Sequence, residues 1–431
     1  MEKVSQERRA AILVAHPTRQ HSHHLAAALD RAGMLQMYLT MVPTMETFER
    51  WPGIGKRLLG SRLEQVDIER SRILCWMSPW ALKRGLDRLI PIGYVSEICA
   101  FAVFDLWVAS FIPRLRPAIL VGYEMACTSS FETAKRNETT CVLDAASFAS
   151  GLQDRLLVSE KRSAVTPVGR WVRRRKSAEI DLADVIICCS NLAEQSYLET
   201  GVPPDRIVIN PPGCDVALFS SQVRSSTGAP KFCFVGTAQE RKGFEDLLIS
   251  FNLHRADSPN SELHIVGDVN AARAFGAAGR SGVTLLGKKN HAELARLLAG
   301  MDVLILPSVL DSFGMVVPEA LAAGLYVILS DRVGAGMMIA DERIGTIVTA
   351  GDRAALTLAM TRIAREIASV RNNAGLRRSI ACSYDWAHYS ERAVQMFEPL
   401  IAGEAWAGRA GTMPRHDSDC RVQSELPNGR I

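Results

Sequence analysis

Two carboxylates, Asp311 and Glu319, lie eight positions apart in the second half of the chain. Phe313 and Gly314 come between them. Because glycine has no side chain to block approach, the backbone amides of Phe313, Gly314 and Met315 can face sugar hydroxyls or a phosphate. Glu319, in the first turns of a predicted helix, is placed to accept two hydrogen bonds from a diol such as a ribose. The structural alternative makes Glu319 a partner of the helix dipole and Asp311 a capping acid.

The pattern around these carboxylates predicts a strand, a loop, a helix and a second strand. Residues 304–331 contain a short apolar run, a Pro-Ser break, an Ala-rich segment that Gly324 ends, and a second apolar run. This is the βαβ unit of a parallel sheet, whose ligands bind at the carboxyl ends of the strands and near helix N-termini. Asp311 and Glu319 would lie on either side of that edge.

Arg241 and Lys242 form a second candidate group. They follow a predicted strand at 232–236 and precede a predicted helix at 244–252. Cations beside the exposed N–H groups of a helix N-terminus suit a diphosphate. A Lys-Gly pair after a strand is weak evidence alone, so the assignment depends on the residues that accompany it.

The composition is that of an ordinary globular protein. A length of 431 residues favours two domains of roughly 200 residues each. A net charge of +4 does not support a nucleic-acid binder. The ten cysteines include no Cys-x-x-Cys pair, so a thiolate zinc site is not expected. We find no signal peptide and therefore expect reduced thiols in a cytosol.

Two segments bear on membrane contact. Residues 89–113 are apolar but contain Glu97 and Asp105, so we predict an amphipathic or buried helix rather than a membrane span. The segment Lys161–Lys176 carries seven cations and no acid, with Trp171 among them. Such a run is usually a solvated face. It can also lie on an anionic membrane, where each cation contributes roughly 1 kcal/mol.

Both halves of the chain repeat an order of strand, loop, helix and strand. Residues 10–42 follow it without Gly-x-Gly-x-x-Gly, which gives no support to an NAD site. The pattern restarts near residue 232, after a Pro-Pro-Gly break at 211–213. We predict an α/β protein with Rossmann-like domains at 1–212 and 213–385, a helix at 386–402 that returns to the first domain, and a disordered tail at 403–431.

Candidates for binding a second substrate lie in the first half. Glu124 and Asp144 end two predicted strands, where they either contact that substrate or cap the following helices. Four of the nine histidines lie in the segment His16–His24, which we predict to be a polar loop. An imidazole or Arg19 could contact the substrate there, or the loop could be merely solvated. A metal site is less favoured, because the spacing matches no standard zinc pattern.

Together these motifs resemble the family 4 glycosyltransferases. The resemblance rests on Asp311-x7-Glu319 with Phe313-Gly314 inside it, on Lys242-Gly243 upstream, and on the boundary segment 210–215, which ends in Cys-Asp. The family pattern is Glu-x7-Glu within Glu-x-Phe-Gly-x-x-x-x-Glu-Ala. The resemblance is specific over residues 184–351 and weaker over 10–145.

The resemblance implies a GT-B fold, with two Rossmann-like domains whose parallel sheets face a central cleft. The second domain would hold a UDP- or GDP-linked nucleotide sugar without a metal, and the first would bind a glycan or lipid-linked acceptor. The implied site residues are Lys242 and Arg241 for the diphosphate, Asp311 for the donor sugar, Glu319 for the ribose, and Gly236, Thr237, Phe313, Gly314 and Met315 for the remaining donor contacts.

Three positions depart from the family pattern. Asp311 replaces the commoner glutamate, which keeps the carboxylate but shortens its reach. Thr237 stands where the family usually has an arginine, a charge that Arg241 could supply. The strand end where many members carry a histidine contains Tyr123 and Glu124.

The predicted function is therefore transfer of a sugar, with retention of its anomeric configuration, in bacterial surface polysaccharide synthesis. The enzyme would be a hexosyltransferase in the cytoplasm or on the inner face of the plasma membrane, with Lys161–Lys176 as a membrane contact. Two alternatives stay open. One is a non-catalytic scaffold of the same fold that binds a nucleotide or glycan, and the other is a different GT-B enzyme such as a sugar-nucleotide epimerase or phosphorylase.

Overall fold

The chain divides into two units in a computed structural model. One unit runs to Pro212 and resumes at Trp386, and the other runs from Gly213 to Asp385. The model describes residues 11–18, 21–42, 44, 66–77, 93–149, 151–152, 155, 166–222, 224 and 227–402. The predicted tail at 403–431, Arg19 and residues 161–165 of the basic run lie outside these ranges.

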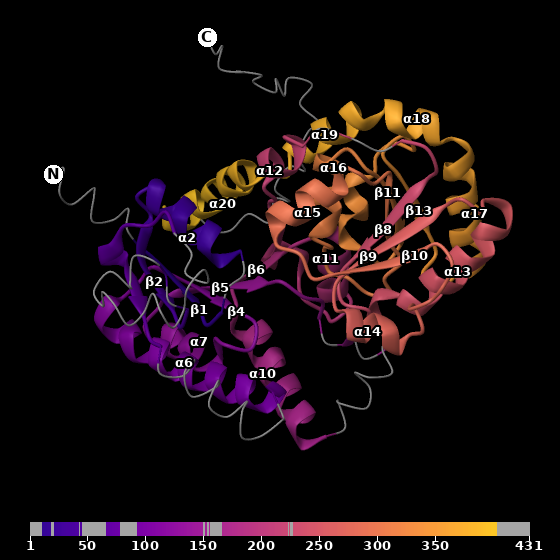
Figure 1. The fold of residues 1–431 in the computed structure, drawn as a ribbon. Coiled ribbons are helices and arrows are strands. Elements are labelled where there is room, and N and C mark those ends of the chain that lie inside the picture. Colours follow the sequence, from indigo (N-terminus) through magenta and orange to yellow (C-terminus); the bar gives the residue numbers. More distant parts are fainter. Residues whose placement is uncertain are drawn as a thin grey trace, which may run out of the picture. The chain divides into compact units, whose positions relative to one another are not determined.

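A seven-stranded parallel sheet forms the first unit (Figure 1). Its strands are β1 (Ile12–His16), β2 (Leu35–Thr40), β3 (Ile73–Cys75), β4 (Ile119–Tyr123), β5 (Thr140–Ala145), β6 (Val185–Cys188) and β7 (Ile207–Ile209). They lie in the order β3-β2-β1-β4-β5-β6-β7. The order reverses between β1 and β4, which makes the carboxyl ends of these two strands a switch point of the kind that binds ligands.

Helices cover both faces of this sheet. They are α2 (Ser22–Arg31), α6 (Gly93–Leu115), α7 (Thr128–Arg136), α10 (Pro167–Leu182), α11 (Asn191–Leu198) and α20 (Trp386–Ile401), with the 3₁₀ turns η2 (Arg70–Arg72) and η3 (Pro204–Arg206). The C-terminal helix α20 lies beside α2 (Figure 1), where Trp386 stacks on His24 with ring centroids 3.5 Å apart. Tyr389 and Phe397 of α20 are buried in the same apolar core as Leu25. The last helix is therefore part of the first unit.

A six-stranded parallel sheet forms the second unit, in the order β10-β9-β8-β11-β12-β13. Its strands are β8 (Lys231–Val235), β9 (Glu262–Val266), β10 (Val283–Gly287), β11 (Val303–Leu306), β12 (Tyr326–Ser330) and β13 (Gly345–Val348). Its helices are α12 (Val216–Ser220), α13 (Phe244–Asp257), α14 (Val269–Ala274), α15 (His291–Leu298), α16 (Val316–Ala322), α17 (Arg353–Arg365), α18 (Ile367–Asn372) and α19 (Ala374–Cys382), with the 3₁₀ turns η4 (Glu240–Lys242) and η5 (Gly334–Met338). Here the strand order reverses between β8 and β11.

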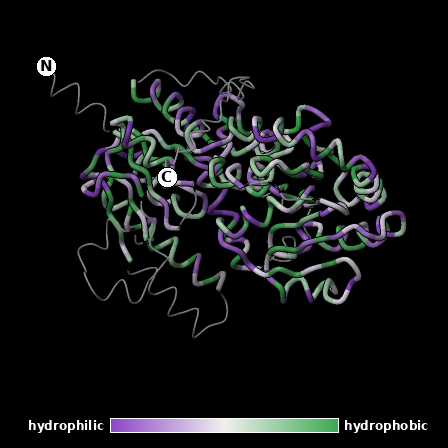
Figure 2. The backbone as a smooth tube through the Cα atoms, turned by 45° about the horizontal axis from the view of Figure 1, so that its top comes forward, coloured by the Kyte–Doolittle hydropathy of each residue, from purple (hydrophilic) through white to green (hydrophobic). Residues whose placement is uncertain are grey.

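Most of the strands are short runs of apolar residues. Figure 2 shows such green apolar stretches alternating with purple polar ones along the backbone. All residues of β1, β4, β6, β11 and β12 are buried. Parallel strands covered on both faces need such continuous apolar runs. The fold class predicted from the sequence, with two Rossmann-like α/β domains, is confirmed.

Within the described residues, one helix is long and apolar enough to cross a membrane. It is α6, of which residues 95–115 meet this test, and 39% of its most apolar 18-residue stretch is buried. Asp105 in its middle is completely buried and accepts hydrogen bonds from the amides of Ser129 and Ser130 at 2.7 and 2.8 Å. The carboxylate thus caps α7, which gives it a structural role within the first unit.

Candidate functional site

The switch point of the second unit brings together the loops that follow β8 and β11. Arg241 and Lys242 lie in η4, after β8, and Asp311 lies in the loop after β11. The Nζ atom of Lys242 forms an ion pair with Oδ2 of Asp311, and both side chains are nearly buried. The structure thus places in contact two residues that the sequence had assigned to one site.

Arg241 connects the same two loops through the backbone. Its guanidinium donates to the carbonyl of Leu310 at 3.1 Å. Its own carbonyl accepts from the amide of Val309 at 2.9 Å. The Arg241 charge therefore lies against the β11 loop, and Lys242 is the cation that faces the Asp311 carboxylate.

Gly243 allows the two loops to approach this closely. It has a φ of 61°, which favours glycine, and a Cβ atom there would lie 2.0 Å from the carbonyl oxygen of Pro307. Gly267 likewise allows close approach to Gly236, because a Cβ atom at residue 267 would lie 1.9 Å from the carbonyl oxygen of Gly236. Thr237 follows this contact and is exposed.

The loop that carries Asp311 is hydrogen-bonded to residues 332–335, which follow β12. The amide of Asp311 donates to Arg332, its carbonyl accepts from Gly334, and the carbonyl of Phe313 accepts from Ala335, at 2.7 to 2.9 Å. These bonds fix the loop backbone and leave the amides of residues 313–315 without an acceptor among the described residues.

The loop amides fit the predicted ligand contacts. Gly314 has a φ of 90°, and a Cβ atom there would lie 3.1 Å from both Leu306 and Val333. Among the described residues, the amides of Phe313, Gly314 and Met315 have no hydrogen-bond acceptor. A cluster of unsatisfied amides beside a cation is a site for an anion or for polar hydroxyls.

Glu319 lies in the first turn of α16, as predicted. It is buried, and this burial raises the pKa of its carboxyl to about 7. The exposed imidazole of His291 lies nearby, with its Nε2 atom 3.8 Å from Oε1 of Glu319. Within the described part of the chain the carboxylate accepts no hydrogen bond. A buried carboxylate left in this state is suited to a ligand that donates two hydroxyls.

In the first unit, Glu124 is part of an internal network. It accepts hydrogen bonds from Ser147 at 2.6 Å and Tyr197 at 3.0 Å, and Lys176 lies 3.8 Å away. The alternative that Glu124 caps the following helix is wrong, because the capping carboxylate of α7 is Asp105. Glu124 thus connects α10 and α11 to the end of β4.

The segment His16–His24 is not the polar loop that we predicted. His16 ends β1 and α2 already begins at Ser22. His23 bonds to the hydroxyl of Tyr38 at 2.9 Å, and His21 bonds to Asp144 at 2.8 Å. The described residues contain no group of three possible ligands that could hold a metal. These imidazoles lie inward because tyrosines and a tryptophan far along the sequence cover them.

The basic run is largely helical, in α10, and two of its cations lie inward. Arg175 pairs with Asp105 and Lys176 approaches Glu124. Glu179, one turn further, accepts from the amide of Met125 at 2.7 Å. This network, which the sequence reasoning did not find, fixes the loop after β4. The only local sign of this network in the sequence is that Glu179 follows Arg175 by four positions, the spacing of an ion pair on one helix face.

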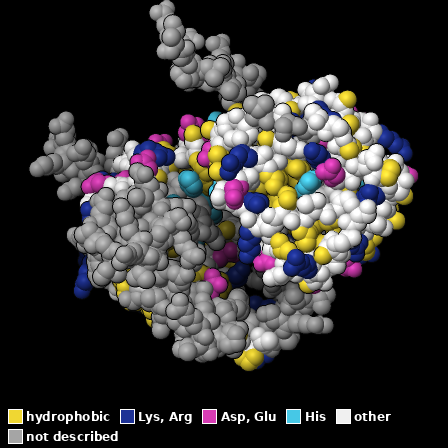
Figure 3. Space-filling view, viewed as in Figure 1, with side chains coloured by type: hydrophobic (Ala, Val, Ile, Leu, Met, Phe, Trp, Pro, Cys, Tyr) yellow, Lys and Arg dark blue, Asp and Glu magenta, His cyan; other side chains and the backbone are white. Residues whose placement is uncertain are grey.

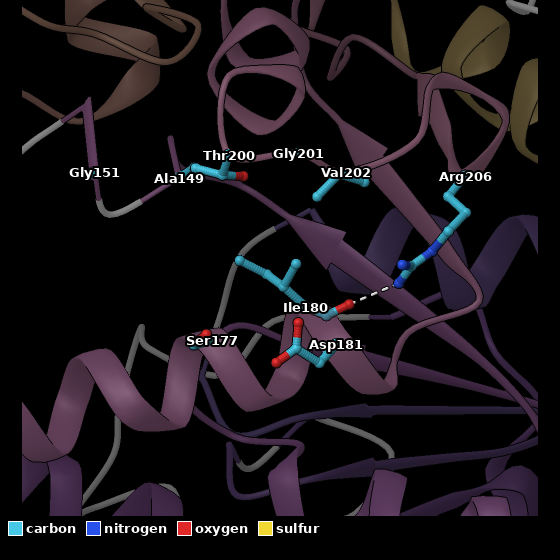
Figure 4. Close-up of a pocket in the computed structure, with 9 residues that line it drawn as sticks. All are labelled: Ala149, Gly151, Ser177, Ile180, Asp181, Thr200, Gly201, Val202 and Arg206. Carbon is cyan, nitrogen blue, oxygen red and sulfur yellow. Dashed lines mark hydrogen bonds between the residues drawn. The ribbon is translucent and has the colours of Figure 1, made fainter.

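A hollow of about 190 Å³ lies between the ends of α10 and α11 (Figure 4). Asp181, Thr200 and Arg206 are among its polar lining residues. The guanidinium of Arg206 donates to the carbonyl of Ile180 at 2.7 Å, and the Thr200 hydroxyl donates to Tyr197 at 2.7 Å. Since these donors already have partners, we assign no site there.

Two Rossmann-like units with parallel sheets are the architecture of the GT-B class of fold. Residues 229–366 match the family model described as Glycosyl transferases group 1. The second unit is thus similar to that family, and this match confirms the predicted resemblance to the family 4 glycosyltransferases.

Comparison with known proteins agrees with this assignment. The chain is 30% identical over 246 residues to a phosphatidyl-myo-inositol mannosyltransferase of Propionibacterium freudenreichii, covering 56% of this chain and 61% of that relative. The chain thus spans about three fifths of the length of that curated relative.

Solved structures show the same fold. Sucrose-phosphate synthase from Thermosynechococcus elongatus has a TM-score of 0.59 at 18% identity, over 91% of this chain and 99% of that chain. HepE of Anabaena in complex with UDP-glucose has a TM-score of 0.59 at 14% identity, over 89% and 98%.

Proposed function

We propose that this protein transfers a hexose from a nucleotide sugar, held by the second unit, to a glycan or lipid-linked acceptor with retention of anomeric configuration. The Lys242–Asp311 pair carries this proposal, because it places a cation, a carboxylate and three unsatisfied amides on one strand edge. A leaving diphosphate needs the cation and the amides, and a sugar needs the carboxylate.

Each residue has a definite part in this reaction. Lys242 would neutralise the charge that develops on the leaving diphosphate, and the amides of residues 313–315 would bind its oxygens or those of the sugar. Asp311 would accept from sugar hydroxyls once the donor shares Lys242. Glu319 would hold the ribose, and Arg241 would keep the two loops together through Leu310. Charge supplied by these side chains makes a metal-independent reaction the expectation.

Retention by double displacement needs a carboxylate nucleophile close to the anomeric carbon. Asp311 is already committed to Lys242, and Glu319 belongs to the ribose in this assignment. We therefore propose front-face attack, in which an oxygen of the donor phosphate accepts the proton of the acceptor hydroxyl. The bond from the acceptor oxygen to the anomeric carbon forms as the bond to the diphosphate breaks.

The acceptor and the cellular role are further parts of the proposal. The names of the relatives suggest an inositol- or lipid-linked acceptor, which fits synthesis of a bacterial surface glycan at the cytoplasmic face of the membrane. In the first unit, Leu106 of α6 and Trp171 of α10 are 61% and 41% exposed, and Arg174 is exposed beside Trp171. Exposed apolar side chains next to cations suit an anionic lipid surface.

The face of the second unit that Figure 3 shows gives no support to a nucleic-acid partner. On the face that Figure 3 shows, its Lys and Arg side chains are interspersed with acidic and apolar ones. Nucleic-acid binding is associated with a continuous basic patch. A small-molecule donor is the better match.

The decisive experiment is a donor screen by mass spectrometry with UDP- and GDP-linked sugars, followed by NMR of the product's anomeric configuration. We expect turnover of one donor and an anomeric configuration in the product that matches the donor. Inversion would contradict the stereochemical part. Absence of UDP and GDP binding in isothermal titration would contradict the donor site itself.

The membrane part of the proposal needs its own experiment. The double variant Leu106→Ser with Trp171→Ser should abolish binding to vesicles that contain anionic lipid. Unchanged binding would refute the membrane contact.

A further inference from the structure

A row of polar side chains crosses the carboxyl edge of the first unit's sheet at its own switch point. Tyr123 at the end of β4 is the direct register partner of Asp144 in β5. His16 ends the neighbouring strand β1, and its ring centroid lies 4.2 Å from that of Tyr123. All three side chains are buried. The row lies where open α/β sheets bind their ligands.

His21, at the start of α2, covers this row. Its Nε2 lies 2.8 Å from Oδ2 of Asp144, and the edges of Tyr123 and Tyr389 pack near it with ring centroids at 5.6 and 6.1 Å. Its side chain is 15% exposed, so it is the member of the group that solvent reaches. No group among the described residues bonds to Nδ1 of His21. The imidazole is therefore held in one orientation with one nitrogen left for a ligand.

The hydroxyl of Tyr123 gives a second, independent observation. It is buried beside Asp144 without a hydrogen bond of normal geometry. A buried polar group without a partner costs free energy, so native proteins pair such groups with protein, water or a ligand. The alternative is that His21 serves only to anchor α2. Its side chain forms no cap of that helix, however, and anchoring does not require an unpaired tyrosine hydroxyl beneath it.

Charge determines the kind of ligand. With Asp144 ionised, the His21–Asp144 pair has a net charge of zero or −1, depending on the proton at His21. Burial lowers the pKa of His16 to about 3, so His16 adds no charge near neutral pH. The group thus does not attract an anion. A ligand hydroxyl both donates and accepts, so it can bond to His21 in either protonation state and also to the Tyr123 hydroxyl.

We propose that His21, Asp144 and Tyr123 form a binding subsite for a hydroxyl group of a neutral polyol. Taking this polyol to be the acceptor's terminal sugar or cyclitol rests on the proposed function. His21 and Tyr123 contact the hydroxyl, and Asp144 is the positioning residue that fixes the imidazole. The residues that we propose for donor binding, in contrast, belong to the second unit.

The test measures binding of three probes to the full chain by saturation-transfer NMR: methyl α-D-mannopyranoside, methyl α-D-glucopyranoside and myo-inositol. We expect at least one to bind the unaltered protein. His21→Ala and Tyr123→Phe should each weaken that binding about tenfold, as expected for loss of one hydrogen bond. His264→Gln is the matched control, because His264 in the second unit is also 15% exposed and lies 2.9 Å from a carboxylate.

Tyr123→Phe keeps the test valid if His21→Ala fails to fold. It removes only an unpaired hydroxyl, so the midpoint of thermal unfolding should stay the same or rise while probe binding falls. A structural role alone would leave probe binding unchanged. The proposal is overturned if no probe binds, or if Tyr123→Phe binds as tightly as the unaltered protein. Titration of UDP and GDP in the same samples keeps the two proposals apart, because failure of nucleotide binding affects only the proposed donor site.

Discussion

The Nζ atom of Lys242 and the Oδ2 atom of Asp311 form an ion pair between residues 69 positions apart. The pair joins the loops after β8 and β11, and its side chains are only 17% and 10% exposed. A nearly buried pair of this kind is expensive to desolvate and weak evidence for stability. Its position at the switch point therefore supports the proposed function, in which a donor diphosphate would take over Lys242.

Replacing Lys242 tests this relationship. Lys242→Ala should reduce the rate of sugar transfer by roughly 10²- to 10³-fold, because one preorganised group that stabilises the leaving diphosphate is lost. Initial rates with the donor from the screen measure the effect, and circular dichroism checks the fold. Lys135→Ala is the control, since Lys135 also pairs with an aspartate, Asp184, but at an exposed place in the first unit. Equal rates for both variants would remove Lys242 from the mechanism.

Glu319 should make donor binding depend on pH. Burial raises the pKa of its carboxyl to about 7, and only the ionised form accepts from both hydroxyls of a ribose. Donor affinity should therefore fall as the pH is lowered from 8 to 6. Glu319→Gln should bind donor weakly at both values, without this dependence. Isothermal titration at a series of pH values measures it, and a steep dependence in the Gln variant would show that another group titrates.

The same pKa predicts an opposite effect on stability. Between pH 4.5 and 7 the folded protein binds more protons at Glu319 than the unfolded chain, so the stability of the free protein falls as pH rises through this window. Glu319→Gln should therefore raise the free energy of unfolding at pH 8, by at most about 3 kcal/mol, and change little at pH 4. Urea denaturation at the two pH values measures the difference. A destabilised Gln variant at pH 8 would contradict the burial argument.

Much of the proposed donor site could be predicted from local sequence. Lys242 and Asp311 each follow an apolar run in a βαβ pattern, and strands of one parallel sheet bring such loops to one edge. Local sequence could not show that the Arg241 guanidinium bonds to the Leu310 carbonyl, because a backbone acceptor has no signature in the residue types. It also could not show that Glu319 is buried, which depends on elements packed over α16.

The first unit was predicted less well for a related reason. His21, His23 and His24 suggest a polar loop when only their neighbours are considered. Their ring partners Tyr38, Trp386 and Tyr389 come from β2 and from a helix more than 360 positions away. Tertiary packing therefore decides that these imidazoles begin α2. The contact between Arg175 and Asp105 is likewise non-local, and it removes one cation from the basic run, for which a solvated face and a membrane contact were both expected as alternatives.

Gly243 should be irreplaceable for the geometry of the cation loop. Gly243→Ala combines a positive φ with a Cβ atom 2.0 Å from the Pro307 oxygen, so the loop must shift and Lys242 must move from Asp311. Gly351→Ala is the matched control, with a φ of 80° and no atom within 4 Å of the added Cβ. The control should cost about 1–2 kcal/mol in unfolding free energy and keep donor affinity. Gly243→Ala should cost more and lose donor binding, and equal effects of the two variants would show that close approach is unimportant.

Arg377 should be the side chain on which the packing behind α16 depends most. It is completely buried and donates to the carbonyls of Gly324, Arg343 and Val370, and burial lowers its pKa to about 10. Arg377→Met fills similar space but removes the donor to these three carbonyls, of which those of Gly324 and Val370 belong to buried residues, so it should lower the free energy of unfolding by about 3–5 kcal/mol. Arg280→Met, at an exposed residue, should change it by less than about 0.5 kcal/mol. Because Gly324 follows the C-terminal end of α16, the Met variant should also weaken donor binding through Glu319. Urea denaturation and nucleotide titration measure the two effects, and a variant as stable as the unaltered protein would mean that water replaces the guanidinium.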